Sequence, residues 1–184
     1  MTSIDPTPST EHLRLRSPSL VQPFHIILVE PEIPPNTGNI ARLCAATGSP
    51  LHLVGKLGFS IDAHAVRRAG LDYWHLVTVK THATLADAEA SIAAEYPNPA
   101  ARTWLLSGKS SQNVYETEFK PGDRFVFGKE SVGLPATLTD ERPEACLALP
   151  TLGAVRSLNL ANATSIVLFE ALRQVGAFRT AVLG

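Results

Sequence analysis

Cysteine is scarce in this sequence, and so are the features that would indicate a metal centre or a membrane span. Cys44 and Cys146 are the two cysteines among 184 residues, and both fall in apolar segments without metal-ligand spacing. We therefore expect buried thiols in a reducing compartment. The six histidines are scattered and no H-E-x-x-H occurs, so no metal ligand set is expected. No run approaches about 18 apolar residues and no apolar signal core is visible, which favours a cytoplasmic protein without a membrane span.

The sequence also lacks an excess of basic residues. Sixteen Lys and Arg stand against 17 Asp and Glu, a formal net charge of −1, so any RNA binding must come from a local positive patch. No G-x-G-x-x-G follows an apolar run, and neither G-x-x-x-x-G-K-[ST] nor G-x-S-x-G is present. A dinucleotide-dependent oxidoreductase on a similar architecture stays an alternative, which a bound nicotinamide cofactor would favour.

What the sequence does contain is an alternation of strand and helix patterns from Phe24 onwards. The first apolar run is continuous and rich in β-branched residues, as is typical of a parallel strand buried on both faces. The alternation predicts one α/β domain over residues 23–184, a mostly parallel sheet with helices on both faces. Residues 1–22 are rich in Pro, Ser and Thr, and we expect a disordered leader there. The expected strands are residues 24–30, 51–55, 75–79, 103–108, 124–128 and 146–150, and the expected helices are residues 37–47, 62–69, 84–95, 136–140 and 159–175.

The segment after the first strand, EPEIPPNTGNIARLCAATG, combines prolines, asparagines and one arginine. Pro34 and Pro35 are expected to delay the helix until Asn36, a good N-cap residue. Asn39 and Arg42 fall on the helix face opposite the apolar residues. Beside asparagines at a helix N-terminus, Arg42 can clamp a phosphate, although a solvated surface arginine is the plainer alternative.

Two further segments follow expected strands. FVFGKESVGLP, residues 125–135, places Gly128 at a strand end, where the missing side chain would let a flat ligand lie against the main chain. LPTLGAVRSLNLANA, residues 149–163, leads through small and polar residues into the last helix. Ligands of open α/β sheets bind beyond the carboxyl ends of the strands, where we expect these loops to lie.

In this order, the three segments resemble the three signature motifs of the SPOUT class of S-adenosylmethionine-dependent RNA methyltransferases. N-T-G-N-I-A-R-L-C-A-A-T-G resembles motif one, F-G-K-E-S-V-G-L-P motif two, and L-P-T-L-G-A-V-R-S-L-N-L-A-N-A motif three. The likeness extends through LHLVGKLGFS and RRAGLDYWHLV to the small, single-domain TrmL (YibK) branch, and covers about residues 24–176. L-A-N-A stands where relatives often have L-S-N-S. The resemblance implies a deep C-terminal trefoil knot across the second and third motifs, which general topology rules would reject.

The resemblance implies an activity and partners as well. It implies 2′-O-methylation of the wobble nucleotide, a cytidine or modified uridine at position 34 in the anticodon loop of leucine tRNAs. The methyl donor would be S-adenosylmethionine, and the enzyme a homodimer joined through the knot region, without a metal. Ala161, Ala163, Ile166 and Val167 of the last helix suit such close packing. Methylation of another tRNA or rRNA nucleotide, and a catalytically silent knotted RNA-binding protein, are the alternatives.

Individual roles follow from the same resemblance. Arg42 corresponds to the motif-one arginine treated as catalytic. A guanidinium keeps its protons at neutral pH, so we expect Arg42 to hold the adjoining phosphate and polarise the ribose hydroxyl, oriented by Asn36 and Asn39. Proton removal has no assigned residue. The expected cofactor-binding residues are Leu106, Gly128, Leu149, Ser157 and Leu158. The expected substrate-binding residues are Glu130, Arg156, Asn159, Asn162, Arg67 and Arg68. Ordering a loop is the alternative for Glu130, and a solvated helix face is an equal alternative for Arg67 and Arg68.

Overall fold

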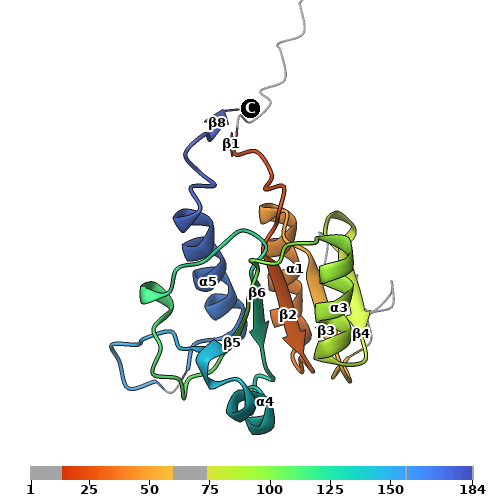
Figure 1. Ribbon diagram of the computed structural model, residues 1–184, viewed down its shortest axis with the longest axis vertical. Coiled ribbons are helices and arrows are strands. Elements are labelled where there is room, and N and C mark those ends of the chain that lie inside the picture. Colours follow the sequence, from red (N-terminus) through yellow and green to blue (C-terminus); the bar gives the residue numbers. More distant parts are fainter. Residues whose placement is uncertain (1–13, 60–73, 156, 184) are drawn as a thin grey trace, which may run out of the picture.

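Six strands form one parallel sheet, in the order β4-β3-β2-β6-β5-β7 (Figure 1). The computed structural model describes residues 14–59, 74–155 and 157–183, so the predicted helix at residues 62–69 and the residues Arg67, Arg68 and Arg156 lie outside it. The predicted mostly parallel α/β sheet is confirmed; the trefoil knot stays a prediction. The strands are β2 (His25–Val29), β3 (Leu51–Val54), β4 (Val79–His82), β5 (Thr103–Leu106), β6 (Arg124–Phe127) and β7 (Cys146–Leu147).

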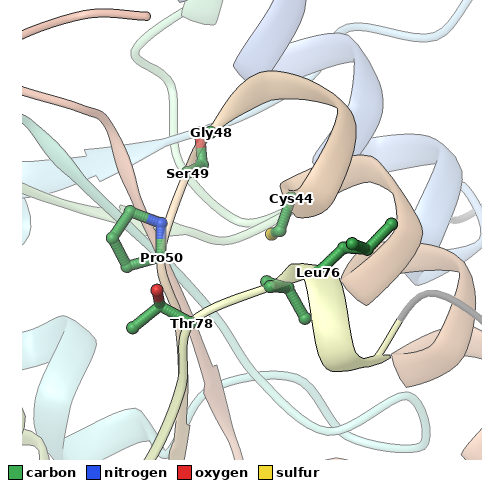
Figure 2. Close-up of a pocket in the computed structure, with 7 residues that line it drawn as sticks. Cys44, Gly48, Ser49, Pro50, Leu76 and Thr78 are labelled. Carbon is green, nitrogen blue, oxygen red and sulfur yellow. The ribbon is translucent and has the colours of Figure 1, made fainter.

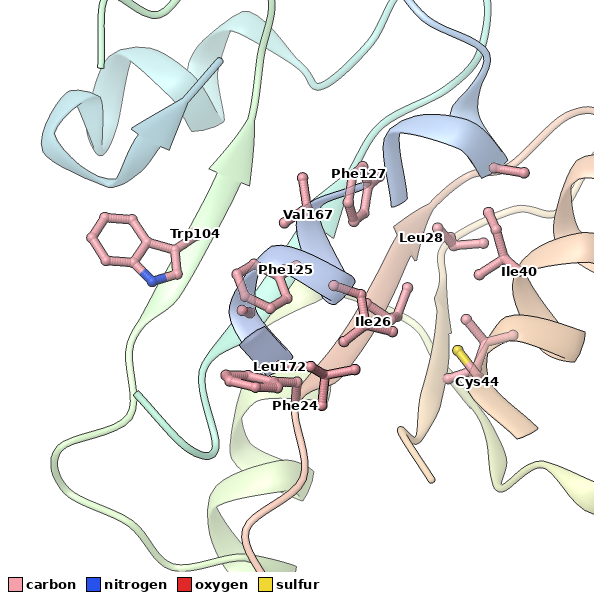
Figure 3. Packing of buried hydrophobic residues seen from close by; sticks show 14 of the residues in the cluster. Phe24, Ile26, Leu28, Ile40, Cys44, Trp104, Phe125, Phe127, Val167 and Leu172 are labelled. Atoms are coloured by element: carbon pink, nitrogen blue, oxygen red, sulfur yellow. The ribbon is translucent and has the colours of Figure 1, made fainter. Parts of the chain in front are cut away.

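Helices cover both faces of this sheet. On one face, α1 (Pro34–Thr47) and α5 (Leu160–Gln174) bury Ile40 and Val167 against a core that includes Ile26 and Phe125 (Figure 3). On the other face, Ile27 packs with residues of α3 (Leu85–Glu95). Neighbouring strand residues are thus buried on opposite faces, which is why the sequence shows continuous apolar runs. The described residues also form the short helices η1 (Trp74–Leu76), η2 (Val114–Glu116), α4 (Ala136–Glu141) and η3 (Pro143–Ala145). Within the described residues, no helix is long and apolar enough to cross a membrane.

Several expected boundaries differ from the structure: the strand expected at residues 146–150, for example, ends at Leu147. Two of the differences have a clear reason. The strand predicted at residues 75–79 is instead η1 followed by β4, because pairing with β3 begins only where Val79 lies opposite Leu51. The first helix does not wait for Asn36: it begins at Pro34, with Ile33 as its N-cap. Proline is tolerated in the first helical turn because the backbone N–H groups there have no partner within the helix.

A two-stranded antiparallel ribbon joins the two ends of the described chain. β1 (Leu15–Arg16) pairs with β8 (Val182–Leu183), and Figure 1 shows the ribbon projecting from the body beyond α5. Two residues of the expected disordered leader, residues 1–22, therefore form a strand, because a partner strand from the far end of the sequence binds their backbone. Residues 1–13 of the leader lie outside the described residues.

Three histidines far apart in the sequence lie in a row across neighbouring strands. His25 Nδ1 lies 3.2 Å from His52 Nε2, and His52 Nδ1 lies 3.0 Å from His82 Nε2. His25 and His52 are almost fully buried. Burial lowers the pKa of His25 to about 4 and that of His52 to about 3, with further lowering by Arg124 at His25 and by the neighbouring His25 at His52. The row is a neutral hydrogen-bonded chain; over the described ranges no group of His, Cys, Asp and Glu is placed to hold a metal ion.

Candidate functional site

Three loops meet beyond the carboxyl ends of the strands. Loop one (residues 30–36, with the first turn of α1 included) follows β2, and loop two (residues 128–134) follows β6. Loop three (residues 148–155 and 157–159) follows β7. Side chains from the three loops are joined in series: Glu130 of loop two contacts Asn36 of loop one, and Asn36 contacts Asn159 of loop three. These residues are 94 and 123 positions apart along the chain, so only the fold brings them together.

Glu130 binds the N-terminal end of α1. Its carboxylate accepts hydrogen bonds from the backbone N–H of Glu32 at 2.8 Å and of Ile33 at 3.2 Å, and from Asn36 Nδ2 at 3.0 Å. The N-cap residue Ile33 has no side-chain acceptor for the first helical turn. The Glu130 carboxylate thus binds the backbone of the N-cap residue and of the residue before it, and its charge is favourable at a helix N-terminus.

Asn36 occupies the centre of the junction. Its side chain is 6% exposed, and its amide oxygen accepts a hydrogen bond of 3.0 Å from Asn159 Nδ2 while its amide nitrogen donates to Glu130. Asn159 in turn caps α5, because its Oδ1 accepts from the backbone N–H of Ala161 and Asn162. The start of α1 and the start of α5 are thus fixed to each other.

Loop two is a tight turn whose geometry changes the reason for Gly128. Lys129 and Gly133 exchange backbone hydrogen bonds of 3.2 and 2.8 Å. A Cβ added to Gly128 would lie 2.1 Å from the carbonyl carbon of Gly133 and 2.2 Å from the backbone nitrogen of Leu134. The space beside Gly128 is therefore filled by the loop's own main chain. The expectation that the missing side chain leaves a slot for a ligand is wrong at this point.

The other expected site residues are distributed over the two helices and loop three. Asn39 and Arg42 lie on the exposed face of α1, and Asn162 on the exposed side of α5. Leu106 and Leu149, at the ends of neighbouring strands, are partly buried against the main core. Ser157 is exposed and Leu158 is 36% exposed.

Loop three leaves apolar side chains uncovered in this part of the molecule. Leu152 is fully exposed and Val155 is 60% exposed, although covering large apolar side chains of a loop is favourable.

A hollow of about 70 Å³ lies before the amino ends of β3 and β4 and is lined by residues such as Cys44 and Thr78 (Figure 2). That hollow is at the opposite ends of the strands from the three loops and takes no part in the junction.

None of the ties between loop one and loop two was predicted from the sequence, and two of them do not involve Asn36 or Glu130. The carboxylate of Glu32 accepts a hydrogen bond of 3.1 Å from the backbone N–H of Ser131, and Lys129 pairs with Glu30 at 2.5 Å. A positive φ of 49° at Glu30, rare for a residue with a side chain, marks the same turn. No local pattern signals such pairs, because their partners lie about a hundred residues apart.

Comparison with known proteins agrees with this arrangement. A model of the SpoU rRNA Methylase family matches residues 23–169. A tRNA (cytidine(34)-2'-O)-methyltransferase of Burkholderia pseudomallei is 48% identical over 154 residues, which are 83% of this chain and 96% of that protein.

Solved structures give the same result. One described as giving structural insights into the 2-OH methylation of C/U34 on tRNA superposes with a TM-score of 0.75 at 39% identity, over 84% of this chain and 97% of the other. An AdoMet-bound rRNA methyltransferase from Sinorhizobium meliloti has a TM-score of 0.67 at 26% identity, over 83% of this chain and 57% of the other. The matched family segment contains all three loops.

Proposed function

We propose that this chain, which belongs to the SpoU rRNA methylase family, transfers a methyl group from S-adenosylmethionine to the ribose 2′-oxygen of nucleotide 34 of a tRNA. The observation that carries the proposal is the junction at Asn36, which joins all three motif loops in one place. The 48% identity to a tRNA (cytidine(34)-2'-O)-methyltransferase over nearly the whole of that relative supports the same substrate.

The residues present fit a methyl donor that has an adenine ring. Leu106, Leu149 and Leu158 offer apolar side chains near the loop ends, and backbone groups of loops two and three offer hydrogen bonds to a polar edge. We assign these leucines, the main chain at Gly128 and the hydroxyl of Ser157 to donor binding. S-adenosylmethionine, when bound, supplies a methyl group already activated on its sulfonium, so the protein has to align the accepting oxygen and assist its deprotonation.

Arg42 is the residue we assign to the accepting oxygen. A guanidinium presents a planar set of donors that suits a phosphate and a neighbouring hydroxyl, and it stays charged at neutral pH. The same α1 helix has its first turn fixed by Glu130 and Asn36, so the position of Arg42 depends on the junction. Asn39, on the same exposed face, is assigned to orienting it, and Asn36 acts through the junction.

The RNA and the second subunit complete the proposal. Asn159 and Asn162, with Arg156, Arg67 and Arg68 outside the described residues, are assigned to the substrate side. Glu130 serves the substrate side by holding the start of α1. Leucine tRNAs in the cytoplasm are the proposed substrates. A homodimer is proposed through the knot region. Of the four α5 residues expected to pack there, Ala161 and Val167 are buried in the subunit's own core, whereas Ala163 and Ile166 are only partly buried. Phe169, a further residue of α5, is 47% exposed.

Single-turnover methyl transfer tests the proposal. Leucine tRNA, radiolabelled S-adenosylmethionine at saturation and excess enzyme should give methyl transfer with the natural chain. Arg42→Ala should lower the rate by at least about a hundredfold, the scale lost when one pre-positioned donor is removed from a transition state. Arg42→Lys should restore little, because a point charge does not reproduce the planar fork.

Cofactor affinity by calorimetry and thermal stability serve as controls, and both should barely change in the Arg42 variants because Arg42 is exposed on α1. A near-natural rate for Arg42→Ala would remove the catalytic assignment. Absence of any S-adenosylmethionine binding by the folded natural chain would remove the methyltransferase proposal and favour a silent RNA-binding protein.

A further inference from the structure

Glu32 and loop two hold each other by a reciprocal pair of hydrogen bonds. The backbone N–H of Glu32 donates to Glu130 Oε2 at 2.8 Å, and the carboxylate of Glu32 accepts from the backbone N–H of Ser131 at 3.1 Å. Side chain and main chain exchange roles between the two loops, as they do within a capping box. Because hydrogen bonds from Ser131 lower the pKa of Glu32, this carboxylate is a charged acceptor at neutral pH.

The main chain of loop one also packs against the segment that follows β3. A Cβ added to Gly58, in the segment after β3, would lie 2.9 Å from Cα of Glu32, and the Gly58 N–H donates to Pro31 O at 3.0 Å. A Cβ at Gly55 would lie 2.8 Å from Cγ of Glu30. The main chain of loop one is thus pressed between the segment after β3 and loop two, so Glu32 is a fixed point from which its carboxylate reaches loop two.

The tip of loop two has little other support among the described contacts. Val132, next to Ser131, is 77% exposed, and the turn is closed by the two backbone hydrogen bonds between Lys129 and Gly133. These bonds fix the shape of the turn, but not its orientation relative to α1. The contacts that set the orientation are those of Glu130 and Glu32, with the exposed pair of Lys129 and Glu30 as a further tie.

We propose that Glu32 is a positioning residue that sets loop two, on the donor side of the site, relative to α1, which carries Arg42. This role rests on the proposed function, because it assigns loop two to the methyl donor and α1 to the accepting ribose. Glu32 touches neither reactant; it acts through the Ser131 amide. Alignment of the two reactants is the quantity it controls, so its loss should affect the rate of transfer more than the affinity for either reactant.

The experiment compares Glu32→Ala, Glu32→Gln and the matched control Glu118→Ala, an exposed carboxylate in the segment before β6. Glutamine keeps an oxygen that can accept from Ser131, whereas alanine does not. Amide hydrogen exchange at Ser131 in the free protein reads the contact itself. Single-turnover transfer and donor affinity read its consequence. We expect Glu32→Ala to lose protection at Ser131 and to transfer at least about tenfold more slowly, with donor affinity changed less than threefold, and Glu32→Gln and Glu118→Ala to stay near the natural chain.

If the Ser131 amide is as well protected from exchange in Glu32→Ala as in the natural chain, the contact between Glu32 and Ser131 is wrong. Lost protection with an unchanged rate overturns the positioning role, as does a Glu32→Gln variant as slow as Glu32→Ala, since the effect would then come from charge. A natural chain that transfers no methyl group overturns the proposed function and the positioning role with it, whereas the exchange data still decide the contact.

Discussion

Asn36 uses both ends of its side-chain amide, and the chemistry of the junction requires this. The amide nitrogen donates to Glu130 and the amide oxygen accepts from Asn159, each at 3.0 Å. An aspartate would lack the donor and would bring two carboxylates together in a nearly buried place. The sequence predicted that Asn36 matters at the start of α1, but for the wrong reason. A local N-cap can be recognised from neighbouring residues, whereas a partner 94 or 123 positions away cannot.

Gly128 gives a prediction about stability. Gly128→Ala should lower the free energy of unfolding by about 1–3 kcal/mol, because the new Cβ would overlap the main chain of Gly133 and Leu134 and the turn would have to move. The same movement should weaken binding of S-adenosylmethionine, since loop two is assigned to it. Chemical denaturation and calorimetry measure the two effects.

Gly153→Ala in loop three is the matched control. A Cβ at Gly153 meets no heavy atom within 4 Å among the described residues, so its stability should stay within about 0.5 kcal/mol of the natural chain. A Gly128→Ala protein as stable as the Gly153→Ala protein would show that loop two yields easily, against the packing described.

At the scale of elements, the histidine row ties together three neighbouring strands at one side of the sheet. His52 uses both ring nitrogens, one towards His25 and one towards His82. A neutral imidazole offers one donor and one acceptor, so both hydrogen bonds of the row can form with all three rings neutral. At the buried end of the row, His25 Nε2 has no hydrogen-bond partner among the described residues. Tyr96, which follows α3, packs edge-on against His25 at a centroid distance of 5.0 Å. The sequence showed only scattered histidines, because strand order decides which of them become neighbours.

The row makes the fold sensitive to acid. The folded pKa values of His25 and His52, about 4 and about 3, lie below the ordinary value of 6.5. The unfolded chain therefore binds protons first as the pH falls. The contribution of the two buried histidines to the free energy of unfolding is fully present above pH 6.5. It is lost as the pH falls towards 4, at up to about 1.4 kcal/mol per pH unit for each buried histidine. Urea denaturation between pH 7.5 and 5 measures this slope.

His25→Phe should reduce the slope of the free energy of unfolding against pH by about the contribution of one proton. The variant removes one of the two buried imidazoles and keeps a ring of similar shape. His75→Ala, which removes an exposed histidine of η1 outside the row, is the control variant. Equal slopes for the natural chain and His25→Phe would mean that the row does not titrate on unfolding.

The elements themselves were largely predictable, and the exceptions have a common cause. Buried strands such as β2 and the capped helix α3 carry local signals: a continuous apolar run in one case, and a capping box at Thr84 and Asp87 in the other. The wrong strand at residues 75–79 lies at the edge of the sheet, where one partner strand alone sets the start of pairing. The helix α1 begins at Pro34, and the carboxylate that binds this end belongs to Glu130, 97 residues away from Ile33, which no local pattern includes.

For the whole molecule, the site is a product of strand order. β6 lies between β2 and β5, and β7 lies beyond β5, so loops one, two and three end at the same edge although they are far apart in the chain. The sequence could predict three polar loops after strands and their resemblance to known motifs. It could not predict that Glu130, Asn36 and Asn159 would join them, because hydrogen bonds between distant loops leave no periodic pattern.

The measurement that tests the central claim most directly is a map of 2′-O-methyl groups in tRNA from cells with and without the gene for this chain. The account predicts a methyl group on nucleotide 34 of leucine tRNA that is lost when the gene is removed. The natural chain should restore it, whereas Arg42→Ala should not. An unmethylated nucleotide 34 in cells that have the gene, or one still methylated after its removal, would contradict the account, as would a methyl group lost only from another position.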